Sequence, residues 1–347
     1  MAEKVLARRT SVDVMFGGTD ITNDIKPYLT SIVYTDDADD LADDLKIQIQ
    51  DRDKVWLQKW LTEAVEAAAG GKLSIGAVIK PEHWKKDGKL KTGAFELDSV
   101  DASGPPATVT INSTSLAFSN DLRQTKKSKA WKNYNLSGIA SEIAGNGGLS
   151  CQYEASTNPS YDRVEQTRQS DIEFLRKLCQ NAGISIKVTD GKLVLYDQAE
   201  YEAKAPVLTI EEGAKGGYIK YKLHSGSADT QYAKCRVRYM DPNTGKCIEG
   251  TAEDGDVSGD QCLEIKAKVG SVGEAQALAK KHLRLHNKLA KTATFTMPGD
   301  VGLVAGVTVQ LKGFGGWDGK YIVTRAVHTV GSGGYTTQIS IRKVLDY

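Results

Sequence analysis

The segment VEQTRQSDIEFLRKLCQNAGISIKVTDGKLVLYD, residues 164–197, gives the clearest indication of the fold. Ser170-Asp171 has the residue types of a helix N-cap, and Asn181-Ala-Gly183 is typical of a helix end. Between them, four apolar residues recur at the period of one helical face: Ile172, Leu175, Leu178 and Cys179. Asp190-Gly191 supplies a two-residue turn between the predicted strands ISIKV and KLVLYD. The segment therefore predicts a helix followed by a β-hairpin, and its polar residues stand at no spacing that catalysis would use.

The residues before this segment belong to the same predicted domain. LSGIASEIAGNGG, residues 136–148, has a helical spacing of apolar residues and stops on glycine. The polar and basic stretch AFSNDLRQTKKSKAWKNYN, residues 117–135, has no sustained period. Its basic part RQTKKSKAWKNY, residues 123–134, is interpreted as a solvated connector or a docking surface for an acidic neighbour. We therefore predict a compact α+β domain over residues 116–205.

The regions on both sides of this domain alternate with a period of two, which is typical of strands. LKIQIQD, LSIGAVI and ATVTINST illustrate the pattern in residues 1–115, and KCRVRYMD, ATFTMPGD and YTTQISIRKV illustrate it in residues 206–347. Each region contains one predicted helix, KVWLQKWLTEAVEAAAGG in the first and GEAQALAKKHLRLHNKLA in the second. The helix in the second region is expected to pack on the second barrel.

The two β-rich regions also form a weak internal repeat. LKIQIQD, LSIGAVI and GAFELDSVDASGPPATVTI align in order with ATFTMPGD, VTVQL and GKYIVTRAVHTVGSGGYTTQISI. In the third pair, Gly93 falls in step with Gly319, Phe95 with Tyr321, and Leu97 with Val323. A true duplication would give two similar β-barrels with a different domain between them, although period-two patterns can also align by chance.

Composition limits the classes of function. The chain has 347 residues, 40% of them hydrophobic and 26% charged, and its net charge of +1 argues against a dedicated nucleic-acid-binding protein. Its five cysteines contain no C-x-x-C pair, which favours reduced thiols over a disulfide framework. No apolar run reaches the length of a membrane span, and the first residues lack the apolar core of a secretory signal, so we expect synthesis in the cytoplasm.

Candidate catalytic and metal-binding residues are few. His282 and His286 stand four apart on a predicted helix, but no glutamate follows the first, and the lysines and arginine around them disfavour a cation. His328 has no obvious acid partner, and we find neither G-x-S-x-G nor a phosphate-binding loop. We therefore expect no catalytic residues, no cofactor and no metal, although a paired-carboxylate hydrolase stays open.

An acidic run in the first region is predicted to be a solvated loop or a charged surface that faces a partner. It lacks the spacing and the glycine of a calcium loop. Because clustered negative charge repels itself unless a basic surface answers it, the run is a reason to suspect an interface. Its members are Asp36, Asp37, Asp39, Asp40, Asp43 and Asp44.

Four passages together resemble the late control protein D family of contractile-tailed phages. They are DDLKIQIQDRDKVW, TKKSKAWKNYNLSGIASEIA, YDRVEQTRQSDIEFLRKLCQNAGISIKVTDGKLVLYD, and GVTVQLKGFGGWDGKYIVTRAVHTVGSGGYTTQISIRKV. The third is the most specific, with its Gln-x-x-x-Ser-Asp-x-x-Phe-Leu core and Asp-Gly-x-Leu hairpin. The resemblance covers nearly the whole chain and depends on the order and spacing of the four passages together.

The resemblance implies an α+β, β-rich fold with two tube-like β-barrel domains, residues 1–115 and 206–347, around the middle domain, residues 116–205. It implies a non-enzymatic tail or baseplate hub that forms a homotrimer, so that six similar barrels match a six-fold tail tube to a three-fold spike. The implied partners are the tail tube protein, the spike protein, other baseplate proteins and the tape measure protein. The implied location is the tail baseplate of a phage or phage-like particle assembled in the bacterial host cytoplasm.

The same resemblance suggests roles for individual residues. Asp171, Phe174 and Leu175 are expected to hold the middle domain together instead of binding a substrate. Five aromatic residues are candidates for interface anchors, with the filling of domain cores as the alternative: Trp56, Trp60, Trp131, Trp317 and Tyr321.

Two alternative functions stay open at this point. One is a tail-tip cell-wall hydrolase or glycan-binding module, suggested by the acid content and the compact middle domain. The other is a single-stranded polynucleotide site on residues 126–131, where Trp131 stands among lysines.

Overall fold

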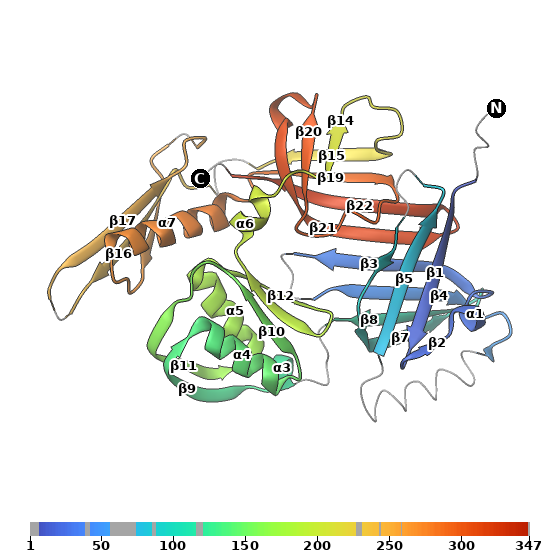
Figure 1. Cartoon of the computed structure of the whole chain (residues 1–347), viewed down its shortest axis with the longest axis horizontal. Coiled ribbons are helices and arrows are strands. Elements are labelled where there is room, and N and C mark those ends of the chain that lie inside the picture. Colours follow the sequence, from blue (N-terminus) through green and yellow to red (C-terminus); the bar gives the residue numbers. More distant parts are fainter. Residues whose placement is uncertain are drawn as a thin grey trace.

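The computed structural model describes residues 7–38, 42–55, 74–84, 88–115, 121–226, 231–242, 244–257 and 259–345. Figure 1 shows two β-rich units side by side, a middle domain of mixed helices and strands, and an arm that extends away from the β units. The fold is mostly β, as predicted. Much of the helix predicted in the first region, from residue 56 onward, lies outside the described residues. No helix within the described ranges is long and apolar enough to span a bilayer.

The first β unit is built on alternating strands whose apolar side chains share one face. Ile32, Leu45 and Ile47, for example, are at most 1% exposed and belong to one core. Its elements are β1 (Arg9–Phe16), β2 (Thr19–Asp20), α1 (Thr22–Ile25), β3 (Leu29–Asp37), β4 (Asp44–Gln50), β5 (Ser74–Glu82), β6 (Leu90–Lys91), β7 (Phe95–Ser103) and β8 (Thr108–Thr114).

The second β unit has its own core around Phe295, Val309 and Tyr321, each fully buried. Its elements are β14 (Leu208–Glu211), β15 (Lys220–Ser225), β19 (Lys291–Pro298), β20 (Thr308–Lys312), the short 3₁₀ helix η3 (Gly315–Trp317), β21 (Gly319–Gly331) and β22 (Gly334–Lys343).

The two units share one strand order. Neighbouring strands run β3-β4-β8-β7-β5 in the first unit and β15-β19-β22-β21-β20 in the second, and each list visits the chain in the same sequence. Both units also carry a register shift at the corresponding point, between Leu97 and Ser99 in β7 and between Val323 and Arg325 in β21. The sequence alignment that places Leu97 with Val323 thus joins residues that occupy the same position in the two units.

One antiparallel ladder connects the units. The first part of β21 pairs with β20, and its second part, from Arg325 to Gly331, pairs with β3 from Asp37 to Ser31. The result is a single 14-stranded sheet. Its strands follow an open path, and no closed barrel is found in the described part of the chain, so the predicted pair of barrels is not confirmed.

The middle domain contains the predicted helix and hairpin. α5 (Asp171–Ala182) begins with a capping box between Ser170 and Glu173 and ends on Gly183, whose φ of 66° is left-handed. β12 (Ser185–Thr189) and β13 (Lys192–Tyr196) form the hairpin. The remaining elements are α3 (Asp121–Gln124), β9 (Lys127–Asn135), α4 (Leu136–Asn146), β10 (Ser150–Glu154) and β11 (Ser160–Gln169).

The interpretation of the basic stretch before α4 as a connector is wrong. Residues 127–135 form β9, which pairs antiparallel with β11. Trp131 alone in this strand turns fully into the core, while most of the lysines and polar residues face outward. A strand with a single buried side chain has no visible alternation, which explains why the period was missed.

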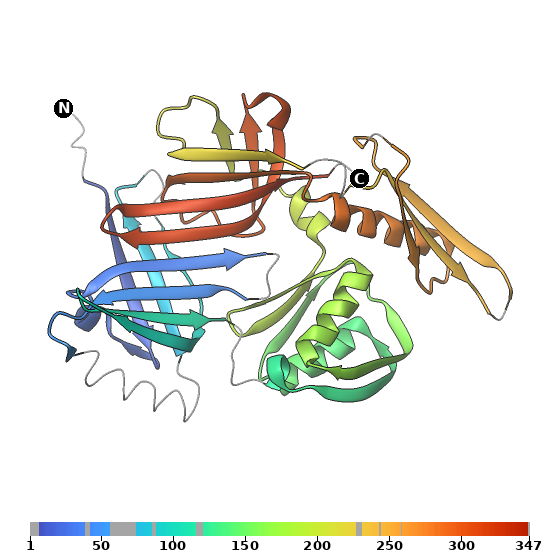
Figure 2. The ribbon, with the colours of Figure 1, turned by 180° about the vertical axis from the view of Figure 1, so that it is seen from behind.

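The arm has a core of its own, formed by Cys235, Val237 and Leu283 among others. It lies in the chain between β15 and β19 of the second β unit. Its elements are β16 (Lys234–Met240), β17 (Cys247–Glu253), β18 (Cys262–Lys266) and α7 (Val272–Asn287). Gly250 lets α7 lie close on β17, because a Cβ there would stand 2.3 Å from the Gln276 nitrogen. The expectation that this helix packs on the second barrel is therefore wrong, because α7 covers the sheet of the arm (Figure 2).

Candidate functional site: domain junctions and open sheet edges

Most of the aromatic residues proposed as interface anchors that the structure describes are buried in domain cores. Trp131 is 2% exposed and Tyr321 is fully buried, so both fill domain cores. Trp317, in η3, is only partly buried against the second core and keeps some exposed surface. Trp56 and Trp60 lie outside the described residues.

The motif residues of the middle domain contact one another. The Lys127 ammonium lies 2.7 Å from a carboxylate oxygen of Asp171, and the Gln166 amide donates to the other oxygen at 2.8 Å. The Trp131 ring stacks on Phe174 with a centroid distance of 6.2 Å. Asp171 and Phe174 are 3% and 2% exposed, and Leu175 is fully buried. These residues therefore tie α5 to β9 and β11, which confirms the expected structural role of Asp171, Phe174 and Leu175.

His328 is also a structural residue, fully buried on β21. Its Nε2 lies 3.0 Å from the Leu303 carbonyl oxygen, so Nε2 carries the proton and donates. Its Nδ1 then accepts from the Tyr335 hydroxyl at 2.8 Å. Burial lowers the pKa of His328 to about 4, so the ring is neutral near pH 7. Its two ring nitrogens are used to hold the loop after β19 against β21 and β22.

The acidic run forms a junction between three parts of the chain. Asp36 and Asp43, 6% and 0% exposed, both pair with Lys187 of β12 in the middle domain. The other oxygen of Asp36 accepts from the Ala305 amide of the second unit at 2.9 Å. The prediction of a solvated loop is therefore wrong for these two residues. The charge that answers these two carboxylates comes from Lys187 of the same chain, and an interface of the acidic run with a partner stays a prediction. Asp39 and Asp40 lie outside the described residues.

Electrostatics at this junction follow from its burial. Desolvation raises the pKa of Asp43 to about 6, against the lowering influence of Lys187. Burial alone would lower the pKa of Lys187, but the two carboxylates outweigh it and raise that pKa. Lys187 is therefore charged near neutral pH and compensates the carboxylates that it contacts.

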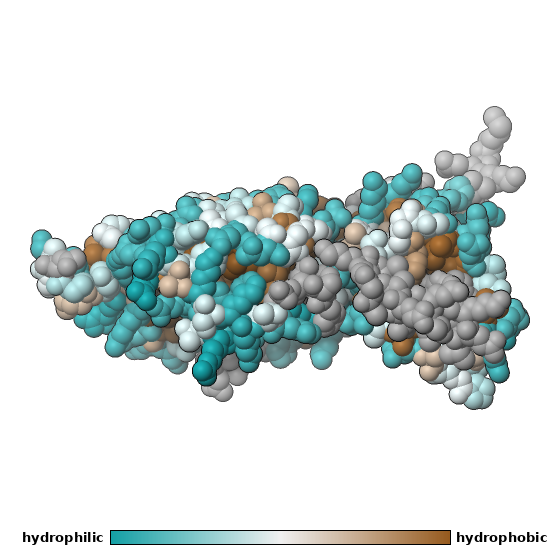
Figure 3. Space-filling model, turned by 90° about the horizontal axis from the view of Figure 1, so that it is seen from below, coloured by the Kyte–Doolittle hydropathy of each residue, from teal (hydrophilic) through white to brown (hydrophobic). Residues whose placement is uncertain are grey.

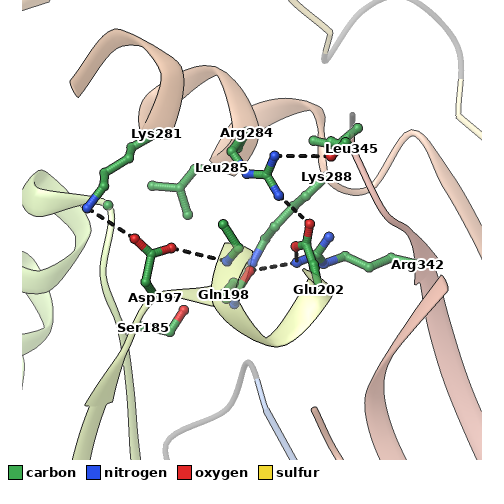
Figure 4. A pocket seen from close by; sticks show the side chains of 12 residues that line it. Ser185, Asp197, Gln198, Glu202, Lys281, Arg284, Leu285, Lys288, Arg342 and Leu345 are labelled. Atoms are coloured by element: carbon green, nitrogen blue, oxygen red, sulfur yellow. Dashed lines mark hydrogen bonds and ion pairs between the residues drawn. The ribbon is translucent and has the colours of Figure 1, made fainter. Parts of the chain in front are cut away.

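A second polar junction surrounds a small cavity of about 30 Å³ (Figure 4). It joins α6 (Gln198–Ala203), which follows the hairpin, to α7 of the arm and β22 of the second unit. Glu202 lies between the guanidinium groups of Arg284 and Arg342 and pairs with both. Asp197 lies 3.4 Å from the Lys281 ammonium. The cavity has room for only about two water molecules, and Asp197, Glu202 and the basic residues that they contact are already paired. It therefore suits the joining of domains better than the binding of a substrate.

The histidine pair of α7 serves contacts within the fold. His282 Nε2 lies 3.2 Å from the Asn181 carbonyl oxygen, and burial lowers the pKa of this ring. The His286 ring meets Tyr232 edge-on at 5.3 Å. Within the described ranges, the structure brings together no group of three histidine, cysteine or carboxylate residues arranged for a metal ion.

In the described part of the 14-stranded sheet, the strands with an unpaired edge include β15 and the second part of β7. β15, at one end of the 14-stranded sheet, has β19 as its neighbour, and the second part of β7 has β8. These edges lie at opposite ends of the joined β units (Figures 1 and 2). The face seen in Figure 3 is largely hydrophilic, with small apolar patches. Sequence reasoning missed these edges because strand order cannot be read from alternation.

The whole architecture matches that of phage tail proteins. The tail protein of Neisseria meningitidis MC58 superposes with a TM-score of 0.69 at 14% identity, covering 96% of each chain. The 43 kDa tail protein of prophage MuSo2 from Shewanella oneidensis gives 0.68 at 13% identity, covering 96% of this chain and 98% of the other.

Comparison of the amino-acid sequence identifies the family of the chain. The chain belongs to the phage tail baseplate hub (GPD) family, whose model matches residues 117–334. A probable baseplate hub protein of Escherichia phage P2 is 29% identical over 190 residues, which are 52% of this chain and 43% of that protein. The aligned part thus spans less than half of the phage P2 protein.

Proposed function

We propose that this chain is a structural, non-enzymatic hub of a tail baseplate in a contractile phage tail or a phage-like particle. In this proposal it acts as a homotrimer in which each subunit contributes two tube-like β domains, residues 1–115 and 206–347, around the middle domain, residues 116–205. Three chains then present six similar β units. A three-fold object of this kind fits between a six-fold tail tube and a three-fold spike.

The observation that carries the proposal is the shared strand order of the two β units, together with the register shift at the same position in each. Similar units in one chain are what a match between three-fold and six-fold symmetry requires. The two units are also already joined edge to edge through β3 and β21, as neighbouring members of a ring would be.

The proposed partners are the tail tube protein, the spike protein, other baseplate proteins and the tape measure protein. Assembly is proposed to take place in the bacterial host cytoplasm, before the particle is released. Trp317 keeps some exposed surface and remains a proposed anchor for one of these contacts. Trp56 and Trp60, which lie outside the described residues, also remain proposed anchors.

Two measurements test the proposal. The mass in solution, from light scattering or native mass spectrometry, is expected to be that of a trimer, and electron microscopy of the assembled particle is expected to place three copies between tube and spike. A chain that stays monomeric with and without the spike, and that is missing from the baseplate, would refute it. Clearing of purified cell wall by the isolated chain would refute the non-enzymatic part.

A further inference from the structure

The ladder between β3 and β21 shows how one β unit receives the edge of another. Ile32 and Tyr34 of β3 oppose Val330 and His328 of β21. Ile32 and His328 are fully buried and Tyr34 is 5% exposed. The ladder therefore covers core-facing positions on both strands while it satisfies the backbone groups of both edges.

β15 occupies in the second unit the place that β3 occupies in the first. Each strand pairs with the strand that follows it in the shared order, β3 with β4 and β15 with β19. Within these ladders Tyr34 opposes Leu45, and Leu223 opposes Ala293. On the next strand along, Leu45 opposes Ser113 of β8, and Ala293 opposes Ile341 of β22. Ser113 and Ile341 are equivalent, because each lies opposite the residue that precedes the shared register shift. By this correspondence Leu223 stands where Tyr34 stands, and Tyr221 stands where Ile32 stands.

β7 occupies in the first unit the place that β21 occupies in the second. Counting from the register shift that the two strands share, Val100 corresponds to Ala326 and Ala102 to His328. In β21 both positions are fully buried, whereas in β7 Val100 is half-buried and Ala102 is exposed. Tyr221 on β15 is likewise 42% exposed. The positions that the β3–β21 ladder covers are therefore uncovered at the other two edges.

We propose that β15 of one copy of this chain pairs antiparallel with residues 99–103 of β7 in the next copy. The pairing repeats the β3–β21 ladder between subunits, and it rests on the proposed hub function, which supplies the ring. Transferring the register of β3 and β21 places Leu223 opposite Ala102, and His224 opposite Asp101. Leu223, Tyr221 and Val100 then share the covered face.

The charges on the two edges favour the pairing of β15 with β7 over the pairing of either strand with a second copy of itself. β15 reads KYKLHS and presents Lys220 and Lys222 on its exposed face, whereas the open part of β7 presents Asp98 and Asp101. In the transferred register, Lys222 lies diagonal to Asp101, within reach of a cross-strand pair. Two copies of β15, or two copies of β7, would bring like charges together. The contact is therefore head-to-tail, the kind of contact that closes into rings.

Charge reversal tests the pairing in the full chain. K220E/K222E and D98K/D101K are each expected to weaken self-association by about tenfold or more, and the four-fold variant that swaps both edges is expected to recover most of it. K266E/K280E is the matched control, because both lysines are exposed on the arm and the change in net charge is the same as in K220E/K222E. Unfolding midpoints of all variants verify that the fold is intact.

Cross-linking tests the register. In a Cys247→Ser background, which removes the exposed native thiol, L223C/A102C is expected to form intersubunit cross-links with a short bis-maleimide. L223C/D101C is expected to cross-link less, because a shift of one residue moves the second thiol to the other face.

The outcomes separate this inference from the proposed function. A trimer that ignores both charge reversals, or whose L223C/A102C variant forms no intersubunit cross-link, overturns the β15–β7 pairing and leaves the hub proposal intact. A wild-type chain that never self-associates overturns both. Loss of association with each reversal and its return in the swapped variant support the pairing.

Discussion

β7 and β21 occupy the same place in the two β units but are composed of different residues. After the shared register shift, β21 continues with buried Ala326 and His328 and is covered by β3. At the equivalent positions β7 has half-buried Val100 and exposed Ala102, with the exposed carboxylate of Asp101 between them. At the position of half-buried Val327 in β21, β7 has exposed Asp101, so a carboxylate stands where the edge is open. The strand order is therefore common to the two units, and the side chains at the edge determine whether each strand meets a neighbour within its own chain.

The largest loss of folding stability is expected at Lys187, where the edge covered by the β3–β21 ladder meets the middle domain. Lys187→Ala removes the charge that faces Asp36 and Asp43, and it leaves two buried carboxylates without compensation. Breaking a buried ion pair in this way typically costs about 3–5 kcal/mol of unfolding free energy. Urea or guanidinium unfolding measures the loss, and Lys192→Ala, at an exposed position of β13, is the control.

Asp36→Asn combined with Asp43→Asn in the Lys187→Ala background should return part of the stability, since neutral amides carry a smaller burial cost. If Lys187→Ala unfolds with wild-type stability, the junction contributes nothing to the covered edge, and the contrast between β21 and β7 lies in their own residues alone.

The second expected effect is a dependence on pH. The pKa of His328 is near 4 in the folded chain against an ordinary value of 6.5, so the unfolded chain binds this proton more tightly. Stability from His328 is therefore present above pH 6.5 and is lost as the pH falls toward 4, by about 3 kcal/mol if no other group responds. Unfolding free energies measured between pH 7 and pH 4 for the wild type and His328→Gln test this, and the variant should lose that part of the slope.

Asp43 acts in the opposite direction in the same interval. Its folded pKa is raised to about 6 from 3.8, so its burial cost is present above pH 6 and is relieved as the pH falls toward 4. Asp43→Asn should therefore steepen the loss of stability on acidification, whereas His328→Gln should flatten it. Equal slopes in the two variants would contradict the assignment of either pKa.

The helix and hairpin of the middle domain and the repeat of the β units could be predicted from the sequence. α5 and the β12–β13 hairpin follow local rules, namely the capping box at Ser170, the left-handed Gly183 and the Asp190-Gly191 turn, so they were found from local patterns. The alignment of Leu97 with Val323 likewise matched positions that the two units share, because both precede the same register shift.

Features that depend on distant contacts could not be predicted. The pairing of Lys187 with Asp36 joins residues 151 positions apart, and neither neighbourhood indicates the other. β9 was missed because Trp131 is its only fully buried side chain. The arm was not separated from the second β unit, because its strands alternate like those of the unit and only their pairing partners differ.

A smaller effect is expected from the hydroxyl that holds His328. Tyr335→Phe removes the donor to Nδ1 but keeps the ring, which is 2% exposed and stacks near His328 at 6.0 Å. Thr337 remains 3.3 Å from the same nitrogen and can donate instead. The loss should be about 1 kcal/mol, the usual size for one buried hydrogen bond. Thermal unfolding of Tyr335→Phe beside Tyr134→Phe, whose hydroxyl lies on an exposed surface, measures it.

The smallest effect on folding is expected at the open edge, where it separates assembly from stability. Asp101→Asn alters an exposed carboxylate that accepts a hydrogen bond from Asn112 at 2.9 Å, and the amide oxygen can accept the same bond. Unfolding free energy should therefore change by no more than about 0.5 kcal/mol. Self-association should nevertheless weaken and become less sensitive to salt, because the carboxylate diagonal to Lys222 in the proposed pairing is gone. Sedimentation at low and high salt measures both changes. If Asp101→Asn lowered folding stability as much as Tyr335→Phe, β7 would be as integral to the monomer as β21, and the difference between the two edges would not hold.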